Sequence, residues 1–307
     1  MQGITYYIKE PRAIGRSILR YGSSLLPDKL YVKWMYYMQT GKRLNLKAPK
    51  SFSEKMQWLK LYNRRPEYTT MVDKYAVKEY VANIIGQEYV IPTIGVWDTP
   101  EDIAWDELPK QFVLKTTHGG GNKGVIVCTD KDRLDKDATV RKLKSSVKID
   151  LYKTLAEWPY KNVRRRIIAE EYLSDGCETE SDTAPHDLID YKYLCFNGKP
   201  LCCMVVSNRR TNKSYDFFDN DWNFMPIRLH DFPNANVKPA KPRNHEAMLS
   251  LAAKIAAGHP HLRVDFYEVE DKVYFGEITF FTLSGYNTIN PEEWDMKLGS
   301  YIQLNQK

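Results

Sequence analysis

The first third of the chain has the hydrophobic spacing of amphipathic helices. Ser51 and Glu54 stand at the spacing of a capping box and predict a helix start. A second helix is predicted over residues 71–85, because Gly86 is a suitable stop. The apolar faces of the two helices are formed by Phe52, Met56, Leu59, Val72, Ala76, Tyr80, Val81 and Ile84.

The middle of the chain alternates short apolar runs with polar segments. The runs are rich in β-branched and aromatic residues, which favour strands. A glycine-rich loop and a long charged segment, predicted to be helical, separate some of these runs. The predicted strands are 89–97 (interrupted by Pro92), 111–115, 125–128 and 167–173; the loop is 116–124 and the charged helix is 130–157.

The last part of the chain predicts two hairpins and one helix. Asn197 and Gly198 stand between two apolar runs, which is a typical hairpin turn. Residues 246–258 predict an apolar, alanine-rich helix that ends in a glycine. Residues 262–280 predict a second hairpin. Strands and helices in this mixed order indicate an α+β fold with mainly antiparallel sheets.

Charge and cysteine content narrow the class of protein. The 307 residues carry a net charge of +6 from 45 basic and 39 acidic residues. This mild, scattered excess suits a small anionic substrate and does not indicate nucleic acid. The five cysteines contain no C-x-x-C pair, which is typical of a reducing compartment. No run approaches the ~18 apolar residues of a membrane span, so we expect a cytoplasmic protein.

The N-terminal segment, residues 1–22, mixes basic and aliphatic side chains and lacks the apolar centre of a signal peptide. Such a segment packs as a helix on the body of the protein or contacts an anionic membrane surface. The second alternative would place the protein at the inner face of the plasma membrane. The side chains concerned are Ile4, Ile8, Lys9, Arg12, Ile14, Arg16, Ile18, Leu19 and Arg20.

The glycine-rich loop, TTHGGGNKG at 116–124, lies between two predicted strands and not before a helix. A P-loop and a Rossmann fingerprint both need a following helix, which argues against them. Three consecutive glycines let backbone N–H groups approach an anion closely, and Lys115 and Lys123 add positive charge. The loop therefore either covers phosphates or is a flexible surface turn.

The hairpin 262–280 carries carboxylates on both strands. Because side chains alternate along a strand, Arg263, Asp265 and Tyr267 share one face. Cross-strand neighbours lie ~5–8 Å apart, so Asp265 and Glu277 can together hold Mg²⁺, which prefers oxygen ligands. An Arg263–Glu277 ion pair on a solvated face is the alternative. On the second strand, we assign one face to Val273, Phe275, Glu277 and Thr279.

Other polar residues are weaker candidates. Glu170 and Glu171 end an apolar strand, where exposed backbone can bind adenine and ribose, or where the charges are simply solvated. Lys192 alternates with apolar residues, so it points into a cleft or lies on an edge strand. Lys74 lies on the predicted helix 71–85, where a solvated lysine is the ordinary interpretation.

Several spaced segments together resemble a known family, the ATP-grasp proteins of bacterial surface-polysaccharide clusters, of the teichuronopeptide-biosynthesis type. They run in family order from near residue 28 to the C-terminus. The segments are SFSEKMQWLKLY, MVDKYAVKEYV, FVLKTTHGGGNKGVIV, IIAEEYL, DYKYLCFNGKP, RVDFYEVEDKVYFGEITF and PEEWDMKLGSYI.

The resemblance implies an ATP-grasp fold, in which two α+β lobes with mainly antiparallel sheets enclose an ATP cleft. We expect four regions in the chain. These are a helical N-terminal segment (1–50), a region before the ATP-grasp lobes (51–110), a small lobe with the glycine-rich loop (111–173) and a large lobe with the metal-binding hairpin (174–307).

The resemblance also implies roles for single residues. Arg263 and Lys192 would be catalytic, and Asp265, Glu277 and Thr279 would hold Mg²⁺. Residues 170–173 would form the adenine hinge. The ATP-binding set is Lys115, Thr117, His118, Gly119, Gly120, Gly121, Lys123, Glu170, Glu171, Tyr172, Leu173 and Lys192.

The sequence departs from better-known ATP-grasp ligases at one metal ligand. Those ligases usually carry Glu-x-Asn, whereas here Thr279 follows Glu277 at that spacing. A hydroxyl is a poorer ligand than a carboxamide oxygen, which weakens a second metal site. Lys74 matches a family position whose role the sequence does not define. The weaker substrate contacts are Lys74, Ser284, Gly285 and Asn287.

These expectations lead to one hypothesis of function. The protein would use ATP and Mg²⁺ to join a carboxylate to an amine through an acylphosphate. By family context, the carboxylate belongs to a small-molecule or lipid-linked glycan and the amine donor is an amino acid or other amine. No side-chain nucleophile is required, which fits the absence of a catalytic-triad motif.

Three rivals remain open at this stage. A glycosyltransferase would use Asp219 and Asp221 in a D-x-D pattern, although the flanking residues favour a hairpin turn. A kinase of the same fold would phosphorylate a hydroxyl. A non-catalytic binding module would retain the fold without turnover, and Thr279 is the residue that favours it.

Overall fold

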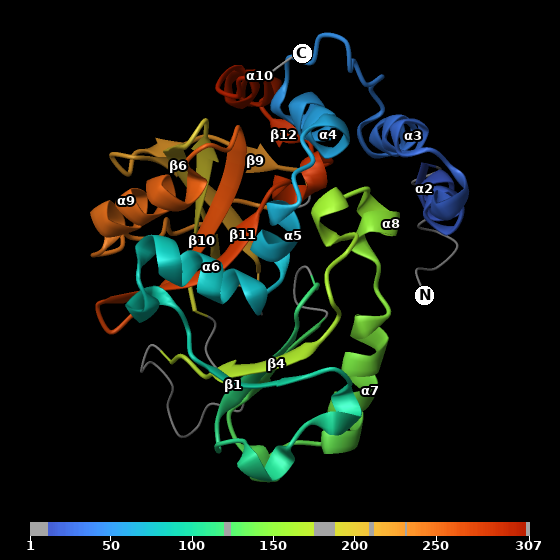
Figure 1. Cartoon of the computed structure of the whole chain (residues 1–307). Helices are drawn as coiled ribbons and strands as arrows, with labels where there is room; N and C mark the ends of the chain where they lie inside the picture. The colour runs from blue at the N-terminus through green and yellow to red at the C-terminus, as the bar shows by residue number, and fades with distance from the viewer. Residues whose placement is uncertain (1–11, 120–123, 175–187, 209–211, 231, 305–307) are drawn as a thin grey trace.

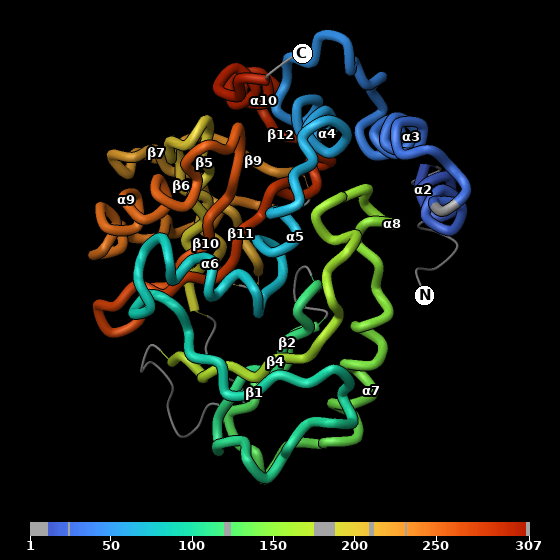
Figure 2. The backbone as a smooth tube through the Cα atoms, viewed as in Figure 1, coloured from blue at the N-terminus to red at the C-terminus, as the bar shows by residue number. Residues whose placement is uncertain are grey.

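The computed structural model describes residues 12–119, 124–174, 188–208, 212–230 and 232–304. Figures 1 and 2 show two lobes, one above the other, with both chain ends on the upper lobe. The α+β prediction with mainly antiparallel sheets is confirmed, because every pairing between named strands is antiparallel. No helix of the described residues is long and apolar enough to cross a membrane.

The small sheet has the strand order β1-β4-β2-β3 and forms the lower lobe in Figure 1. Strand β2 alternates buried and half-buried side chains, and α7 packs against it with Leu143. One strand comes from the range 51–110, so this sheet begins before residue 111. The strands are β1 (Thr93–Trp97), β2 (Phe112–Thr116), β3 (Val125–Cys128) and β4 (Ile167–Glu171).

The large sheet has the order β11-β10-β5-β6-β7-β8 and belongs to the upper lobe. Helix α9 packs on it, and α6 packs on α9. Asn197 and Gly198 form the predicted turn between β5 and β6. The strands are β5 (Asp190–Phe196), β6 (Lys199–Ser207), β7 (Ser214–Asp219), β8 (Phe224–Met225), β10 (His261–Val269) and β11 (Lys272–Thr279); β9 (Arg228–Leu229) and β12 (Ile289–Asn290) form a separate pair.

The helices lie around these sheets, and the predicted capping box is confirmed. Ser51 Oγ accepts the N–H of Glu54, whose carboxylate accepts the N–H of Ser51. The helices are α2 (Arg12–Tyr21), α3 (Asp28–Thr40), α4 (Phe52–Tyr62), α5 (Glu67–Val72), α6 (Ala76–Ile85), α7 (Lys136–Val147), α8 (Leu151–Leu155), α9 (His245–Ala256) and α10 (Glu292–Ser300).

Two predicted helices are wrong as continuous elements. The range 71–85 is divided between α5 and α6, because Asp73 is extended and accepts the N–H groups of Tyr75 and Ala76. The range 130–157 contains α7 and α8, each begun by an aspartate that caps it, Asp135 and Asp150. In both cases short-range capping ends a helix that the hydrophobic period alone would continue.

The hairpin formed by β10 and β11 also differs from the prediction in one respect. A register shift between Asp265 and Phe266 places Phe266 opposite Phe275, in the core, while Asp265 stays opposite Glu277. Val273 and Phe275 are therefore not on the face of Glu277 and Thr279, and our assignment of the four to one face is wrong. A bulge inserts one residue, which reverses the side-chain alternation beyond it.

Candidate active site

A cleft of about 1030 Å³ lies between the two sheets and receives side chains from both lobes. The small lobe contributes Lys115 and Glu170, and the large lobe contributes the polar face of β5, β10 and β11. Of the residues predicted for the site, the cleft is lined by Lys74, Lys115, Glu170, Lys192, Arg263, Asp265, Glu277, Thr279, Ser284 and Asn287.

Strand register explains why distant polar residues meet on the large sheet. Asp265 of β10 pairs with Lys192 of β5 on one side and with Glu277 of β11 on the other. Directly paired residues project from the same face of a sheet. Arg263 and Thr279 form the next pair along β10 and β11, and they therefore stand on this face as well.

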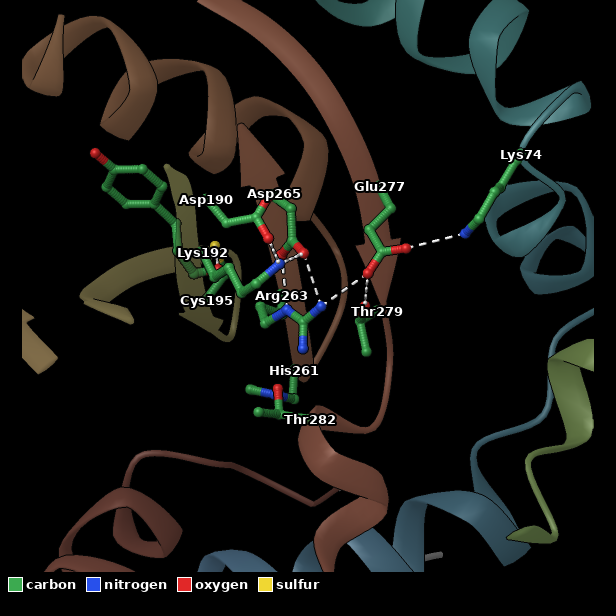
Figure 3. A network of polar contacts seen from close by, with 11 residues as sticks. Lys74, Asp190, Lys192, Cys195, His261, Arg263, Asp265, Glu277, Thr279 and Thr282 are labelled. Atoms are coloured by element: carbon green, nitrogen blue, oxygen red, sulfur yellow. Dashed lines mark hydrogen bonds and ion pairs between the residues drawn. The ribbon is translucent and has the colours of Figure 1, made fainter. Parts of the chain in front are cut away.

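Arg263 joins the two predicted metal ligands. Its Nε and Nη2 donate to the two Asp265 oxygens, each at 2.7 Å, and Nη2 also donates to Glu277 Oε1 at 2.9 Å. Lys74 Nζ donates to Glu277 Oε2 at 3.0 Å from the other side, as Figure 3 shows. The Thr279 hydroxyl donates to Glu277 Oε1 at 3.4 Å.

Lys192 extends this network to a third carboxylate. Its Nζ contacts Asp265 Oδ2 and lies 3.1 Å from Asp190 Oδ2. Carboxylates and cations thus alternate across the wall of the cleft (Figure 3). We call this the charge chain; its members in spatial order are Asp190, Lys192, Asp265, Arg263, Glu277 and Lys74.

The charge chain keeps its acids ionised despite burial. Burial alone would raise the pKa of Glu277, but Lys74, Arg263 and Lys192 outweigh it and hold that pKa well below its usual range. Burial alone would lower the pKa of Arg263, but Asp265 and Glu277 raise it above its ordinary value. Both groups are therefore charged at neutral pH, and their positions are fixed by one another.

A second cluster, which we call the Glu170 cluster, joins Glu170 and Lys115 of the small-lobe wall to Lys78 of α6. Glu170 contacts Lys78 Nζ at 2.6 Å through one oxygen and Lys115 Nζ through the other. Burial would raise the pKa of Glu170, but the two lysines outweigh it and lower that pKa. Two cations therefore surround one carboxylate on this wall.

Other residues of the predicted ATP-binding set do not line the cleft. Thr117 Oγ1 donates to Arg164 O at 2.8 Å, and His118 Nε2 lies 3.1 Å from Ile149 O. These side chains anchor the start of the loop to neighbouring segments. Gly119, Glu171, Tyr172 and Leu173 are also absent from the lining. Gly120, Gly121 and Lys123 lie outside the described residues.

The segment after β11 shapes the wall beside the charge chain. Leu283 and Ser284 adopt φ of 51° and 55°, a left-handed conformation that costs non-glycine residues energy. Gly285 follows with φ of 63°, and a Cβ there would lie 2.4 Å from Met56 Cβ. Ser284 and Asn287 face the cleft, whereas Gly285 permits the close approach to α4.

The buried Lys60 supports that segment from behind. Lys60 Nζ donates to Ser284 O at 2.8 Å and to Ser284 Oγ at 2.7 Å. Burial raises the pKa of Glu157, which lines the cleft, although Lys60 and a hydrogen bond from Ser284 partly offset this effect. Burial likewise lowers the pKa of Lys60.

Sequence reasoning missed four charged residues of this site. Asp190 stands two positions before Lys192 on the same strand, so strand alternation could have found it. Lys78 stands four residues after Lys74 on the predicted helix 71–85, so helical spacing could have found it. No local signal marks Lys60 or Glu157, because tertiary packing alone brings them together.

The donor set fits Mg²⁺ bound with a nucleotide. Among the residues the structure describes, no group of three or more His, Cys, Asp or Glu could hold a metal alone. Mg²⁺ sites commonly use one or two carboxylates together with substrate phosphates and water. Asp265 and Glu277, which face each other in the cleft, supply those two carboxylates. Thr279 also lines the cleft, and its hydroxyl donates to Glu277.

Comparison with known proteins gives a family. The model of the TupA-like ATPgrasp family matches residues 54–303. No curated protein matches the chain.

Solved structures of low similarity complete the comparison. D-alanine–D-alanine ligase from Helicobacter pylori is 13% identical, with a TM-score of 0.42, over 83% of this chain and 70% of that one. The ligase from Bacillus anthracis is 19% identical, with a TM-score of 0.38, over 69% and 57%. The ATP-grasp ligase PsnB, complexed with minimal precursor, is 9% identical, with a TM-score of 0.39, over 75% and 60%. The family match covers most of the chain, and on that ground the protein belongs to the TupA-like ATP-grasp family.

Proposed function

We propose that this protein is an ATP-dependent carboxylate–amine ligase. One observation carries the proposal: a single cleft is lined by the charge chain of the large lobe and, from the small lobe, by Lys115 and Glu170. The first supplies the carboxylates of Asp265 and Glu277, and the second supplies the ammonium group of Lys115. A nucleotide triphosphate with its magnesium needs both, because the metal takes oxygen ligands and the phosphates take cations.

The residues then divide by role. Lys115 and Lys192, one from each lobe, would contact phosphate oxygens, and Asp265 and Glu277 would hold Mg²⁺. When bound, Mg²⁺ neutralises phosphate charge and polarises the transferred phosphoryl group. Residues 170–173 and the loop 116–124 remain our proposal for the adenine hinge and the phosphate cover.

The reaction needs no nucleophile from the chain. A substrate carboxylate oxygen attacks the γ-phosphorus of ATP, the bond to the bridging oxygen breaks, and ADP leaves. The amine nitrogen then attacks the acyl carbon, phosphate leaves with the bonding electrons, and the nitrogen loses a proton. Arg263 stabilises the negative charge that develops, since its guanidinium is fixed by Asp265 and Glu277.

The charge of the cleft supports an acidic acceptor. Arg12, Arg16 and Lys213 also line it, and the described residues show no carboxylate within ion-pair distance of Arg12 or Lys213. Arg12 and Arg16 stand on one helix and give the part of the cleft that they line, which we call its basic end, a positive charge that attracts anionic substrates. We therefore propose that the carboxylate belongs to an acidic sugar of a surface polysaccharide, small or lipid-linked, and that the protein is cytoplasmic.

The glycosyltransferase alternative finds less support. Asp219 accepts the N–H groups of Asp221 and Asn223, at 3.0 and 2.8 Å, and so stabilises its own turn. Neither Asp219 nor Asp221 lines the cleft. A D-x-D metal site would need carboxylate oxygens directed at a nucleotide, whereas one of these carboxylates is used by the backbone.

The first test is thermal stabilisation by Mg-ATP and, separately, by Mg-UDP-sugars. A ligand that binds only the folded state raises the midpoint of unfolding. We expect stabilisation by Mg-ATP that weakens in Glu277→Gln and persists in the matched control Glu246→Gln, an exposed acid outside the cleft. Stabilisation by a UDP-sugar alone would contradict the ligase proposal.

A second test separates ligase from kinase chemistry. Incubation with Mg-ATP, an acidic sugar and hydroxylamine should trap an acylphosphate as a hydroxamate, with release of ADP. A kinase would give a phosphate ester that hydroxylamine does not cleave. ADP release with that stable product would replace the ligase proposal by the kinase.

A further inference from the structure

An apolar surface covers the N-terminal helices, far from the cores of the two sheets. We call α2, η1 (Ser23–Leu25) and α3 the N-terminal hairpin; Figure 1 shows its two helices side by side at the edge of the upper lobe. Half of the large hydrophobic side chains that are exposed in the described residues belong to it, seven of fourteen. They form the exposed apolar set: Ile14, Ile18, Tyr21, Leu25, Leu30, Trp34 and Tyr37.

The exposed apolar set follows helical spacing and is not scattered. In α2 its members stand at i, i+4 and i+7, and the same holds for the members in α3. Residues at this spacing form one stripe along a helix. Exposure reaches 65% for Ile18, 92% for Tyr21 and 52% for Trp34. The buried residues of α3, Tyr31 and Met35 among them, lie on the opposite side of that helix.

Basic residues accompany the stripes. Residues 12–43 contain seven lysines and arginines and one acid, Asp28. Asp28 is already paired with Arg64, at 2.6 Å. Lys29 and Lys33 are exposed and stand one position before Leu30 and Trp34. An apolar stripe bordered by cations is complementary to a lipid surface, in which negatively charged headgroups cover apolar acyl chains.

Helix α2 connects this surface to the cleft. Arg12 and Arg16 line the cleft, while Ile14 and Ile18 on the same helix are exposed to solvent. The helix therefore presents one side to the substrate site and another to the outside. Whatever binds the exposed side will lie beside the basic end of the cleft.

We propose that the N-terminal hairpin docks the protein on an anionic phospholipid membrane. Its apolar set enters the boundary between headgroups and acyl chains, and its exposed Lys29 and Lys33 contact lipid phosphates. A second copy of this chain is a poorer occupant, because two surfaces with the same cationic excess would repel each other. Docking would hold the basic end of the cleft near the membrane, where a lipid-linked acidic glycan is accessible. Docking itself requires neither ATP nor catalysis, so it stands or fails separately from the ligase proposal.

Co-sedimentation with vesicles tests the docking. We expect the protein to bind phosphatidylcholine vesicles that contain phosphatidylglycerol and not vesicles of phosphatidylcholine alone. Ile18→Glu/Leu25→Glu should lower the bound fraction by about tenfold, because charged side chains are excluded from the acyl region. The matched control is Val237→Glu, since Val237 is 86% exposed on another part of the molecule. Equal binding by all three proteins, or no binding by wild type, would overturn the proposal.

A charge variant keeps the test decisive if the double variant misfolds. Lys29→Gln/Lys33→Gln changes only exposed side chains, and it should weaken binding to anionic vesicles while it leaves stabilisation by Mg-ATP unchanged. Binding should also fall as salt is raised, because ions screen charges beyond about 8 Å at 0.15 M. Dimerisation of wild type by light scattering that Ile18→Glu/Leu25→Glu abolishes, without vesicle binding, would assign the surface to a second copy.

Discussion

The two walls of the cleft carry ionised groups in different proportions. On the large-lobe wall, the charge chain alternates three carboxylates with three cations. On the small-lobe wall, the Glu170 cluster holds one carboxylate between two lysines. The first wall is neutral in sum and holds acids in place, whereas the second has an excess of positive charge.

From this difference we infer that the two walls contact different parts of one ligand. Cations hold the Glu277 carboxylate ionised, so this group can accept a divalent ion without releasing a proton. In the proposed binding mode, the ammonium group of Lys115 would turn from Glu170 to phosphate. Lys74 and Lys78, which serve opposite walls, both come from the short stretch at the start of α6. That stretch also bonds the loop, through Lys74 N–H to Thr117 O at 2.9 Å.

The largest effect should follow removal of the arginine at the centre of the charge chain. Arg263→Ala leaves Asp265, which is 1% exposed, with one cation fewer and Glu277 without its Oε1 partner. Removing one partner of a buried ion pair costs about 3–5 kcal/mol. We expect a loss of this size in the free energy of unfolding, measured by urea denaturation at pH 7, and loss of ADP release.

Arg243→Ala is the matched control for this variant. Arg243 donates to Asp271 at 2.7 Å, but its side chain is 80% exposed. Exposed pairs contribute at most about 1 kcal/mol, because water and salt screen them. If the two variants lost equal stability, the charge chain would not be the tightly coupled unit that its burial indicates.

On acidification, Glu170 and Glu277 should become protonated, and lose their contribution to stability, at different pH values. Both acids have folded pKa values below the unfolded value of about 4.3, so their ionised forms contribute stability above that pH. Each contribution disappears as the pH falls through the folded pKa. The pKa of Glu277 is lowered further than that of Glu170, so the Glu170 cluster should be lost first on acidification.

Denaturation curves between pH 7 and pH 3 measure this order. Glu170→Gln should reduce the fall in the free energy of unfolding at the higher pH values of this range, and Glu277→Gln should reduce it at the lower ones. Each effect should be about 1–3 kcal/mol, as for hydrogen bonds to charged groups. Glu246→Gln, at an exposed acid, is the control. A decline that both cleft variants alter over the same pH range would mean that the two walls titrate as one unit.

Sequence patterns predicted the elements of both walls better than their contacts. The Asn197-Gly198 turn and the facing of Asp265 and Glu277 followed from turn chemistry and strand alternation. The alternation failed at Phe275 because Gly276 is the extra residue of a bulge, and the prediction did not use this isolated strand glycine as the bulge signal that it is. Likewise, the Asp73 carboxylate accepts the N–H groups of Tyr75 and Ala76 and interrupts the helix there, although the hydrophobic period continues past this residue.

The partners of the predicted ligands were beyond sequence reasoning for a physical reason. Lys192 and Arg263 were found because they alternate with apolar residues, yet their mutual links depend on the order β11-β10-β5, which is a long-range property. Glu157 and Lys60 influence each other's pKa only after α4 and the segment after α8 pack together, where Lys60 Nζ donates to Leu155 O at 3.0 Å. The sequence therefore indicated which residues carry charge, and the topology decided which charges meet.

The smallest effect should come from the acidic pair that belongs to neither wall. Asp219→Ala/Asp221→Ala removes the acceptor of the N–H of Asn223, and turn hydrogen bonds contribute about 0.5–1.5 kcal/mol. Stability should fall by that amount, while stabilisation by Mg-ATP should match wild type, because neither residue lines the cleft. Loss of the Mg-ATP response in this variant, with the fold retained by circular dichroism, would show that metal-holding acids extend beyond the large-lobe wall. The contrast between a wall that holds acids for a metal and one that holds cations for phosphate would then no longer describe how the protein binds its nucleotide.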